Sequence, residues 1–124
     1  MEEEFRAVLL ATAGVTALAG TRIEFGGNAQ GATYPRIALW TISDAGEPTL
    51  DGAGLSVGRI QVDAYALTYG AAKMLARAVR AALDCYSGGN FQGIFLAGTR
   101  DTREDGVVER PYRTSLDFIT NYSG

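Results

Sequence analysis

The stretch RIQVDAYALTYGAAKMLARAVRAALD, residues 59–84, decides the fold. It begins within an alternating segment, residues 57–67, in which Ile60, Val62, Ala64 and Ala66 alternate with Arg59, Gln61, Asp63 and Tyr65. This alternation predicts a strand with one buried face and one polar face. Thr68 follows as an N-cap, and residues 69–84 place apolar side chains at helical spacing around one narrow charged stripe. The alanine-rich surface of this helix predicts close packing on a sheet.

The elements on either side are shorter or less regular. Residues 2–12 place Phe5, Val8 and Leu9 on one helical face, and we expect this helix to break at Gly14 and to stop at Gly20. Strands are predicted over residues 22–25, 36–43 and 108–122, and within residues 93–103. Residues 26–33, 44–54, 87–90 and 104–106 are predicted as loops and turns.

Length and element order define the fold class. The 124 residues amount to one domain, with 47% hydrophobic and 20% charged residues. The order of the elements predicts a single α+β domain over residues 1–124. Its antiparallel sheet has about four strands, and two helices pack on one face of that sheet.

Composition excludes several function classes. The chain has no histidine, and its single cysteine is Cys85, so no Ser-His pair, disulfide or cysteine-rich metal site is expected. Eleven basic against fourteen acidic residues argue against a protein that tracks nucleic-acid phosphates. The glutamates at positions 2–4 have the wrong sign for a signal peptide, and residues 7–21 are too short to span a membrane. We therefore expect a soluble protein made in the cytoplasm, with no cofactor and no metal.

Asp63 and Asp117 are the one carboxylate pair that suits general acid–base chemistry. Arg59 and Arg113 precede them by four residues on the same faces of their strands. Cross-strand ion pairs are therefore the favoured interpretation. The acidic groups around residues 44–51 and 101–105 lack EF-hand spacing, and no glycine-rich phosphate motif is present. No catalytic residue is predicted.

What remains is suited to assembly with other proteins. The predicted subunit interface or lumen lining consists of Arg59, Gln61, Asp63, Tyr65, Arg113, Ser115 and Asp117. The predicted axial contacts lie in the loop 44–54 and the hairpin 97–109, namely Asp44, Glu47, Asp51, Arg100, Asp101 and Arg103.

The sequence resembles the small tail-completion, or tail-terminator, proteins of long-tailed bacteriophages and gene-transfer agents. Residues 59–84 carry the resemblance, together with VTALAGTRIEFGGNAQGATYPRIALWTIS at 15–43 and RTSLDF at 113–118. These stretches span nearly the whole chain in matching order. One departure is Arg36, where an apolar or aromatic residue is expected after Pro35.

The resemblance implies a non-enzymatic virion protein of the tail, assembled in the host cytoplasm. It implies a six-fold ring at the head-proximal end of the tail tube, which ends tube growth and joins the tail to the head. The implied partners are other copies of the chain, the tail tube protein and the head–tail connector or stopper. Neither a membrane nor sequence-specific nucleic acid is implied, although the genome passes through the ring lumen.

Three alternatives stay open from the residues alone. The first is a small cytoplasmic α+β ligand-binding or regulatory domain that acts as a dimer. The second is a histidine-free enzyme that uses Asp63 or Asp117 with an arginine. The third is a joining protein on the head side rather than the tail side.

Overall fold

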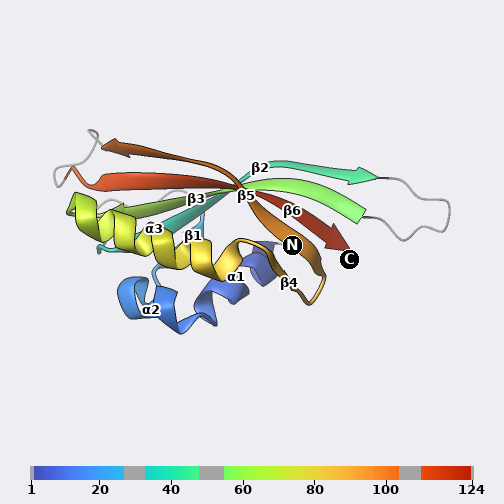
Figure 1. The fold of residues 1–124 in the computed structure, drawn as a ribbon, viewed down its shortest axis with the longest axis horizontal. Helices are drawn as coiled ribbons and strands as arrows, with labels where there is room; N and C mark the ends of the chain where they lie inside the picture. The colour runs from blue at the N-terminus through green and yellow to red at the C-terminus, as the bar shows by residue number, and fades with distance from the viewer. Residues whose placement is uncertain (1, 27–32, 48–54, 104–109, 124) are drawn as a thin grey trace.

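The computed structural model describes residues 2–26, 33–47, 55–103 and 110–123 (Figure 1). In chain order the elements are α1 (Glu2–Leu10), α2 (Ala13–Ala19), β1 (Ile23–Phe25), β2 (Arg36–Glu47), β3 (Leu55–Ala66), α3 (Tyr69–Leu83), β4 (Tyr86–Gly88), β5 (Phe91–Arg103) and β6 (Tyr112–Ser123). The predicted α+β class is confirmed. The predicted element count is wrong, because the described residues form six strands and three helices rather than about four and two.

The extra elements have local causes. The N-terminal helix ends at Leu10, ahead of Gly14, and a separate helix begins at Ala13. At this break the Thr12 hydroxyl donates to the Val8 carbonyl at 2.8 Å. At the other end of the sheet, β4 occupies part of the predicted turn 87–90. The sequence did not indicate this strand, because three residues are too few to show a periodic pattern.

The long strands differ from prediction at their ends. β2 continues to Glu47 and β3 begins at Leu55, so part of the predicted loop 44–54 is an antiparallel ladder. Residues 48–54 lie outside the described part of the chain. β5 begins at Phe91, and β6 begins at Tyr112 rather than at residue 108. β2, β3 and β5 are longer than predicted because a paired neighbouring strand supplies hydrogen bonds that local sequence propensity does not include.

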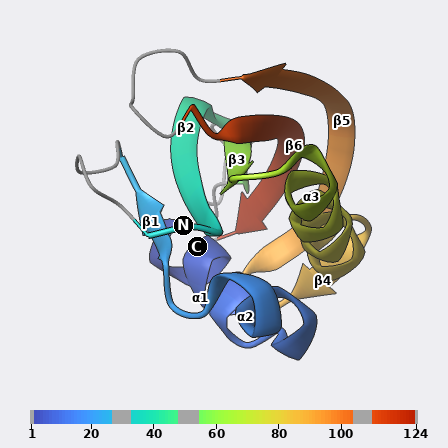
Figure 2. The same ribbon diagram turned by 90° about the vertical axis from the view of Figure 1, so that its left-hand side faces the viewer.

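The sheet has the order β1-β2-β3-β6-β5-β4 and is antiparallel except for the β1–β2 pair. The last strand, β6, lies between β3 and β5, with Ile60 opposite Phe118 and Val62 opposite Leu116. Viewed from one end, the sheet curls around the helices (Figure 2). The β2–β3 and β5–β6 hairpins point to opposite ends of the long axis (Figure 1).

Helix α3 forms where the sequence predicts it. The Thr68 hydroxyl accepts a hydrogen bond from the Ala71 backbone N–H at 3.1 Å, which confirms the N-cap. The side chains that this helix buries against the sheet are Ala72, Leu75, Ala76, Val79 and Leu83. None of the described helices is long and apolar enough to cross a bilayer.

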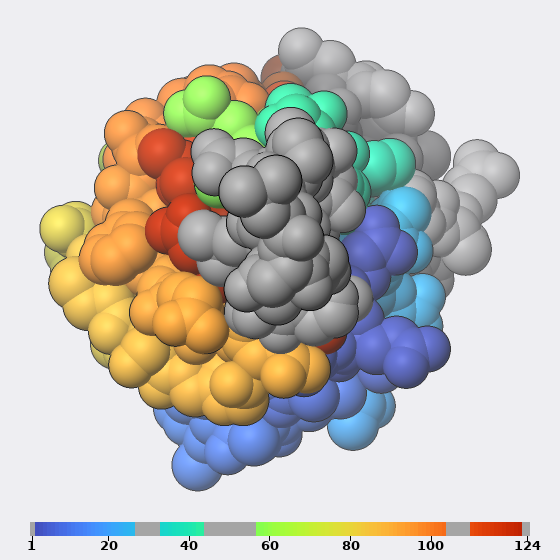
Figure 3. Space-filling view, turned by 90° about the vertical axis from the view of Figure 1, so that its right-hand side faces the viewer, coloured from blue at the N-terminus to red at the C-terminus, as the bar shows by residue number. Residues whose placement is uncertain are grey.

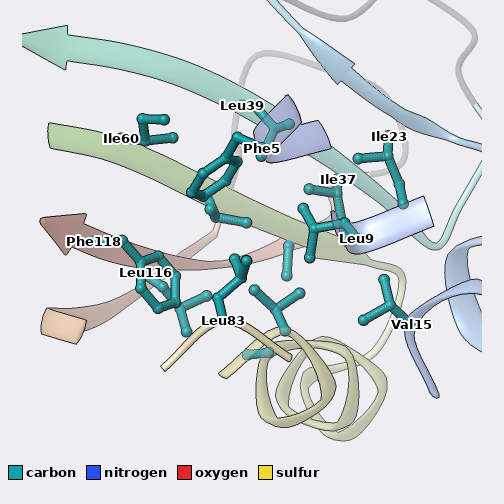
Figure 4. Close-up of a cluster of buried hydrophobic side chains, with 14 of the residues drawn as sticks. Phe5, Leu9, Val15, Ile23, Ile37, Leu39, Ile60, Leu83, Leu116 and Phe118 are labelled. Carbon is teal, nitrogen blue, oxygen red and sulfur yellow. The ribbon is translucent and has the colours of Figure 1, made fainter. Parts of the chain in front are cut away.

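One hydrophobic core holds the helices to the sheet (Figure 4). Phe5 and Leu9 of α1 and Val15 of α2 enter it from the helix side, and all three are fully buried. Ile60, Val62 and Ala64 of β3, all predicted to be buried, lie in this core, as do Leu116 and Phe118 of β6. The helices therefore cover one face of the sheet, and the opposite face is available for contacts.

Candidate assembly interface

The helix-free side of the sheet, called the outer face here, carries most of the predicted interface residues. Residues that face the core alternate with residues that face away from it, and the strand register aligns the latter in rows. Three rows cross β2, β3, β6 and β5 in that order: Arg36–Tyr65–Arg113–Thr102, Ala38–Asp63–Ser115–Arg100 and Trp40–Gln61–Asp117–Gly98. The structure thus brings the β3 and β6 candidates together on one surface.

Asp63 lies at the centre of this outer face and is only 1% exposed. Its carboxylate accepts hydrogen bonds from the Ser115 hydroxyl at 2.7 Å, the Gln61 amide at 2.9 Å and the Trp40 indole N–H at 3.1 Å. The prediction that Asp63 forms ion pairs on an exposed or interfacial face is wrong for the isolated chain. The three donors come from β2, β3 and β6, so the carboxylate links three strands of its own sheet.

Asp117 is paired with a different arginine from the one predicted. Arg100 of β5 binds the Asp117 carboxylate at 3.0 Å and also donates to the Gln61 side chain at 3.0 Å. Arg113 instead donates to the Thr102 hydroxyl at 2.9 Å. The reason is register, because Arg100 sits opposite Ser115, one row from Asp117, and a long side chain reaches diagonally.

Arg36 and Tyr65 form a second buried contact on this outer face. The Arg36 guanidinium lies 4.2 Å from the centre of the Tyr65 ring, and Arg36 is 7% exposed. The Arg36 Nε has no hydrogen-bond partner among the described residues. Stacking on an aromatic ring explains how an arginine fills a position where an apolar residue was expected. Tyr65, predicted on the polar face, is buried as a result.

Apolar side chains are exposed on the same sheet. Trp40 and Ile42 project from β2, Phe95 from β5 and Ile119 from β6, with exposures between 37% and 53%. Phe95 and Ile119 are cross-strand neighbours, and Arg59 is opposite Ile119 on β3. Clustered apolar side chains on a surface mark a site of protein contact.

The predicted axial residues lie at opposite ends of the sheet. Asp44 and Glu47 are in the last part of β2, and Asp51 lies outside the described residues. Arg100, Asp101 and Arg103 are in the last part of β5. Figure 3 looks at the end where β2 finishes and β3 begins, with β5 and α3 on one side and α1 on the other.

Asp101 is held within its own chain. Its carboxylate binds the Lys73 ammonium at 2.7 Å and accepts from the Thr114 hydroxyl at 3.0 Å and the Tyr69 hydroxyl at 3.3 Å. The hydrogen bond from Lys73 is the main cause that lowers the pKa of Asp101, and the same contact raises the pKa of Lys73. This cluster joins the start of α3 to β5 and β6.

The sequence did not reveal the parts that Trp40 and Arg100 play in the hydrogen bonds of the outer face. The available signal was the alternation along β2, which places Trp40 on the same face as Arg36. Within the described ranges, no group of three or more acidic or cysteine side chains is placed to hold a metal ion.

A family model described as "Tail completion protein gp17" matches residues 3–123. The chain belongs to this tail completion family. Its place is the virion tail, and its role there is structural, so both the predicted resemblance and the predicted location are confirmed.

A solved structure has a similar fold. It is a chain from the virion of a native gene transfer agent particle, with a TM-score of 0.78 and 20% sequence identity. The alignment covers 97% of this chain and 92% of that chain. Among curated proteins, no sequence matches this chain.

Proposed function

We propose that this tail protein forms a ring, hexameric as predicted, at the head-proximal end of the tail tube. The ring ends growth of the tube and joins the tail to the head connector or stopper. The observation that carries this proposal is the opposed arrangement of the two long hairpins in a member of the tail completion family. A joining ring needs two different axial surfaces, one for each neighbour.

The strand directions supply those two surfaces. β3 and β6 are antiparallel along their whole length, with Leu55 opposite Ser123 and Ala66 opposite Tyr112. Consequently β2 and β3 meet at one end of the sheet, and β5 and β6 meet at the other end. With the two hairpins facing opposite ends of the ring axis, one hairpin contacts the tube protein and the other contacts the connector.

The outer face is then the lumen lining or part of the subunit contact. Arg59 is exposed and has no ion pair among the described residues, whereas Asp117 and Arg100 neutralise one another. Such a surface lets the genome pass without reading its sequence. The function requires neither a cofactor nor a catalytic group, and we propose that the protein is not an enzyme.

Deletion and add-back test the proposal. Particles made without the protein should yield full heads and separate, unjoined tails of irregular length, and purified protein should restore joining. Electron microscopy of repaired tails should show a six-fold ring at the head-proximal end. Tails of normal length that join heads without the protein would refute the proposal, as would a stable dimer that binds a metabolite and never associates with tubes.

A further inference from the structure

The two long outer strands of the sheet are each paired along only half of their outer edge. The short strand β1 covers β2 at residues 37–39, and β4 covers β5 between Phe91 and Ile94. The Asp84 carboxylate then accepts from the Leu96 N–H at 3.0 Å. Within the described residues, no backbone group pairs with the outer edge of residues 40–47 of β2 or 97–103 of β5. These two segments are called the open halves.

The backbone groups that point out of each open half follow from the ladder. Ile37 donates its backbone N–H to the Arg22 carbonyl, and the Leu39 carbonyl accepts from the Gly26 N–H. Backbone groups of alternate residues point to the same edge of a strand, so the N–H and C=O of Thr41 also point out of the sheet edge. On β5, Ile94 accepts from Cys85 on the outer side. The bulge between Leu96 and Gly98 adds one residue and shifts the alternation by one. After it, the backbone groups of Thr99 and Asp101 are the ones that point out of the sheet edge.

We propose that neighbouring copies of this chain join edge to edge, with the open half of β2 in one copy pairing antiparallel with the open half of β5 in the next. The contact makes one β-sheet run through the whole assembly. This inference rests on the proposed ring and names the surfaces that close it.

Strand direction favours this pairing. Each neighbour within the sheet reverses direction from β2 to β3, β6 and β5, so β2 and β5 run in opposite directions. A rotation about the ring axis preserves the component of each strand's direction along that axis, so every strand keeps its sense from one copy to the next. The β5 strand of one copy therefore meets the β2 strand of the next copy in antiparallel orientation, and such head-to-tail contacts close into rings.

The positions of the open halves also fit a closed barrel. Trp40 and Gly98 lie in the same row, and from there the two open halves extend in opposite directions. Bringing them side by side requires a shift of about five to six residues between copies, or roughly 18 Å along the strands. Four strands are about 19 Å wide, so the strands tilt by ~45° from the ring axis, near the tilt that closed barrels adopt. In this arrangement β1 and β4 lie beyond the ends of the new pair and do not obstruct it.

Charge favours two different edges over two identical ones. The open half of β2 contains Asp44 and Glu47 and no basic residue. The open half of β5 contains Arg100 and Arg103, and its one acid, Asp101, is already paired with Lys73. By sequence, the two segments carry net charges of opposite sign, so pairing β2 with β5 joins unlike charges, whereas pairing two β2 segments would join like charges. Neither open half contains the lysine or proline that commonly protects a free edge.

Proline substitution tests the edge without changing the ladder inside the chain. Thr99→Pro and Thr41→Pro each remove one outward N–H, and both positions are exposed. The matched controls Thr99→Val and Thr41→Val keep the N–H and lose only the hydroxyl. We expect both proline variants to retain the wild-type fold and to lose ring formation on purified tail tubes by tenfold or more, while the valine variants assemble as the wild type does.

Mixing the two proline variants gives a second test. Each variant keeps one intact edge, so a 1:1 mixture should form dimers and nothing larger, although each variant alone stays monomeric. Dimers of Thr99→Pro alone would indicate β2–β2 pairing and overturn the proposal. Rings that form as well with proline as with valine would also overturn it, yet would leave the proposed function standing. A wild-type protein that never forms rings would refute the proposed function itself.

Amide hydrogen exchange on the wild-type protein covers the case in which the proline variants do not fold. The outward N–H groups of Thr41 and Thr99 should exchange at least tenfold more slowly in the ring than in the monomer. Unchanged exchange at both positions in an assembled ring would overturn the edge pairing.

Discussion

Replacing Asp63 with alanine tests whether the outer face of the sheet is held together from within. The side chain is almost fully buried and accepts three hydrogen bonds, from Ser115, Gln61 and Trp40. Ser115 is also completely buried, so its hydroxyl loses its partner without access to water. Trp40 and Gln61 are partly exposed, so water can replace the carboxylate for them.

The expected loss of stability follows from these exposures. An unsatisfied buried donor costs about 1–3 kcal/mol, and hydrogen bonds to a charged acceptor contribute about 1.5–3 kcal/mol each. Counting Ser115 in full and the other two donors in part, Asp63→Ala should lower the free energy of unfolding by about 2–4 kcal/mol. Asp63→Asn should fall between the wild type and alanine, because its amide keeps one acceptor but faces other donors.

Urea denaturation followed by tryptophan fluorescence is the direct assay. Trp40 is the only tryptophan and donates to this carboxylate, so its emission reports on the site itself. A double-mutant cycle with Ser115→Ala should give a coupling energy of about 1–2 kcal/mol. A loss below about 0.5 kcal/mol for Asp63→Ala would refute the reasoning. If that variant were stable but unable to assemble, Asp63 would instead be a direct subunit contact, as the sequence alone predicted.

Three further predictions concern the helices. Asp101, with its lowered pKa, stabilises the fold above the pKa of the unfolded carboxyl, and this stabilisation is lost as pH falls through the lower folded value. At pH 7, Asp101→Asn and Lys73→Met should each lower the free energy of unfolding by a small, salt-sensitive amount. The urea midpoint of Asp101→Asn should then approach that of the wild type as the pH is lowered from 5 to 3. Thr68→Ala should cost about 1 kcal/mol in the same assay, and Thr68→Ser should restore it. The Glu4 carboxylate accepts from the Asn90 backbone at 2.8 Å, so Glu4→Ala should speed amide exchange at Asn90, while Glu4→Gln retains partial protection.

Sequence reasoning was most successful where the evidence was local. The strand at residues 57–67 and the helix after Thr68 were predicted from alternation, helical spacing and one capping residue, and the structure has them as β3 and α3. The family was predicted from the resemblance of residues 15–43, 59–84 and 113–118, and it is confirmed. Of the two short strands, β1 was predicted as a strand, whereas β4 was predicted as a turn.

The placement of charged residues was predicted less well, for a physical reason. Spacing within a strand shows which face a residue occupies, and the β3 and β6 candidates do share one face. It does not show which side chains from other strands cover that face. Asp63 and Tyr65 are buried because Trp40 and Arg36 of β2 lie over them, and Asp117 pairs with Arg100 because β5 is the neighbour of β6.

The sequence by itself determined the amphipathic strand and the helix that packs on it, because periodicity and capping depend on residues a few positions apart. The family was indicated separately, by the resemblance of residues 15–43, 59–84 and 113–118. Only the tertiary structure decided that β6 inserts between β3 and β5, which strands remain open at the edges, and which carboxylates are buried. Those properties depend on contacts between residues far apart in the chain. A pattern read along one strand contains no information about its neighbours.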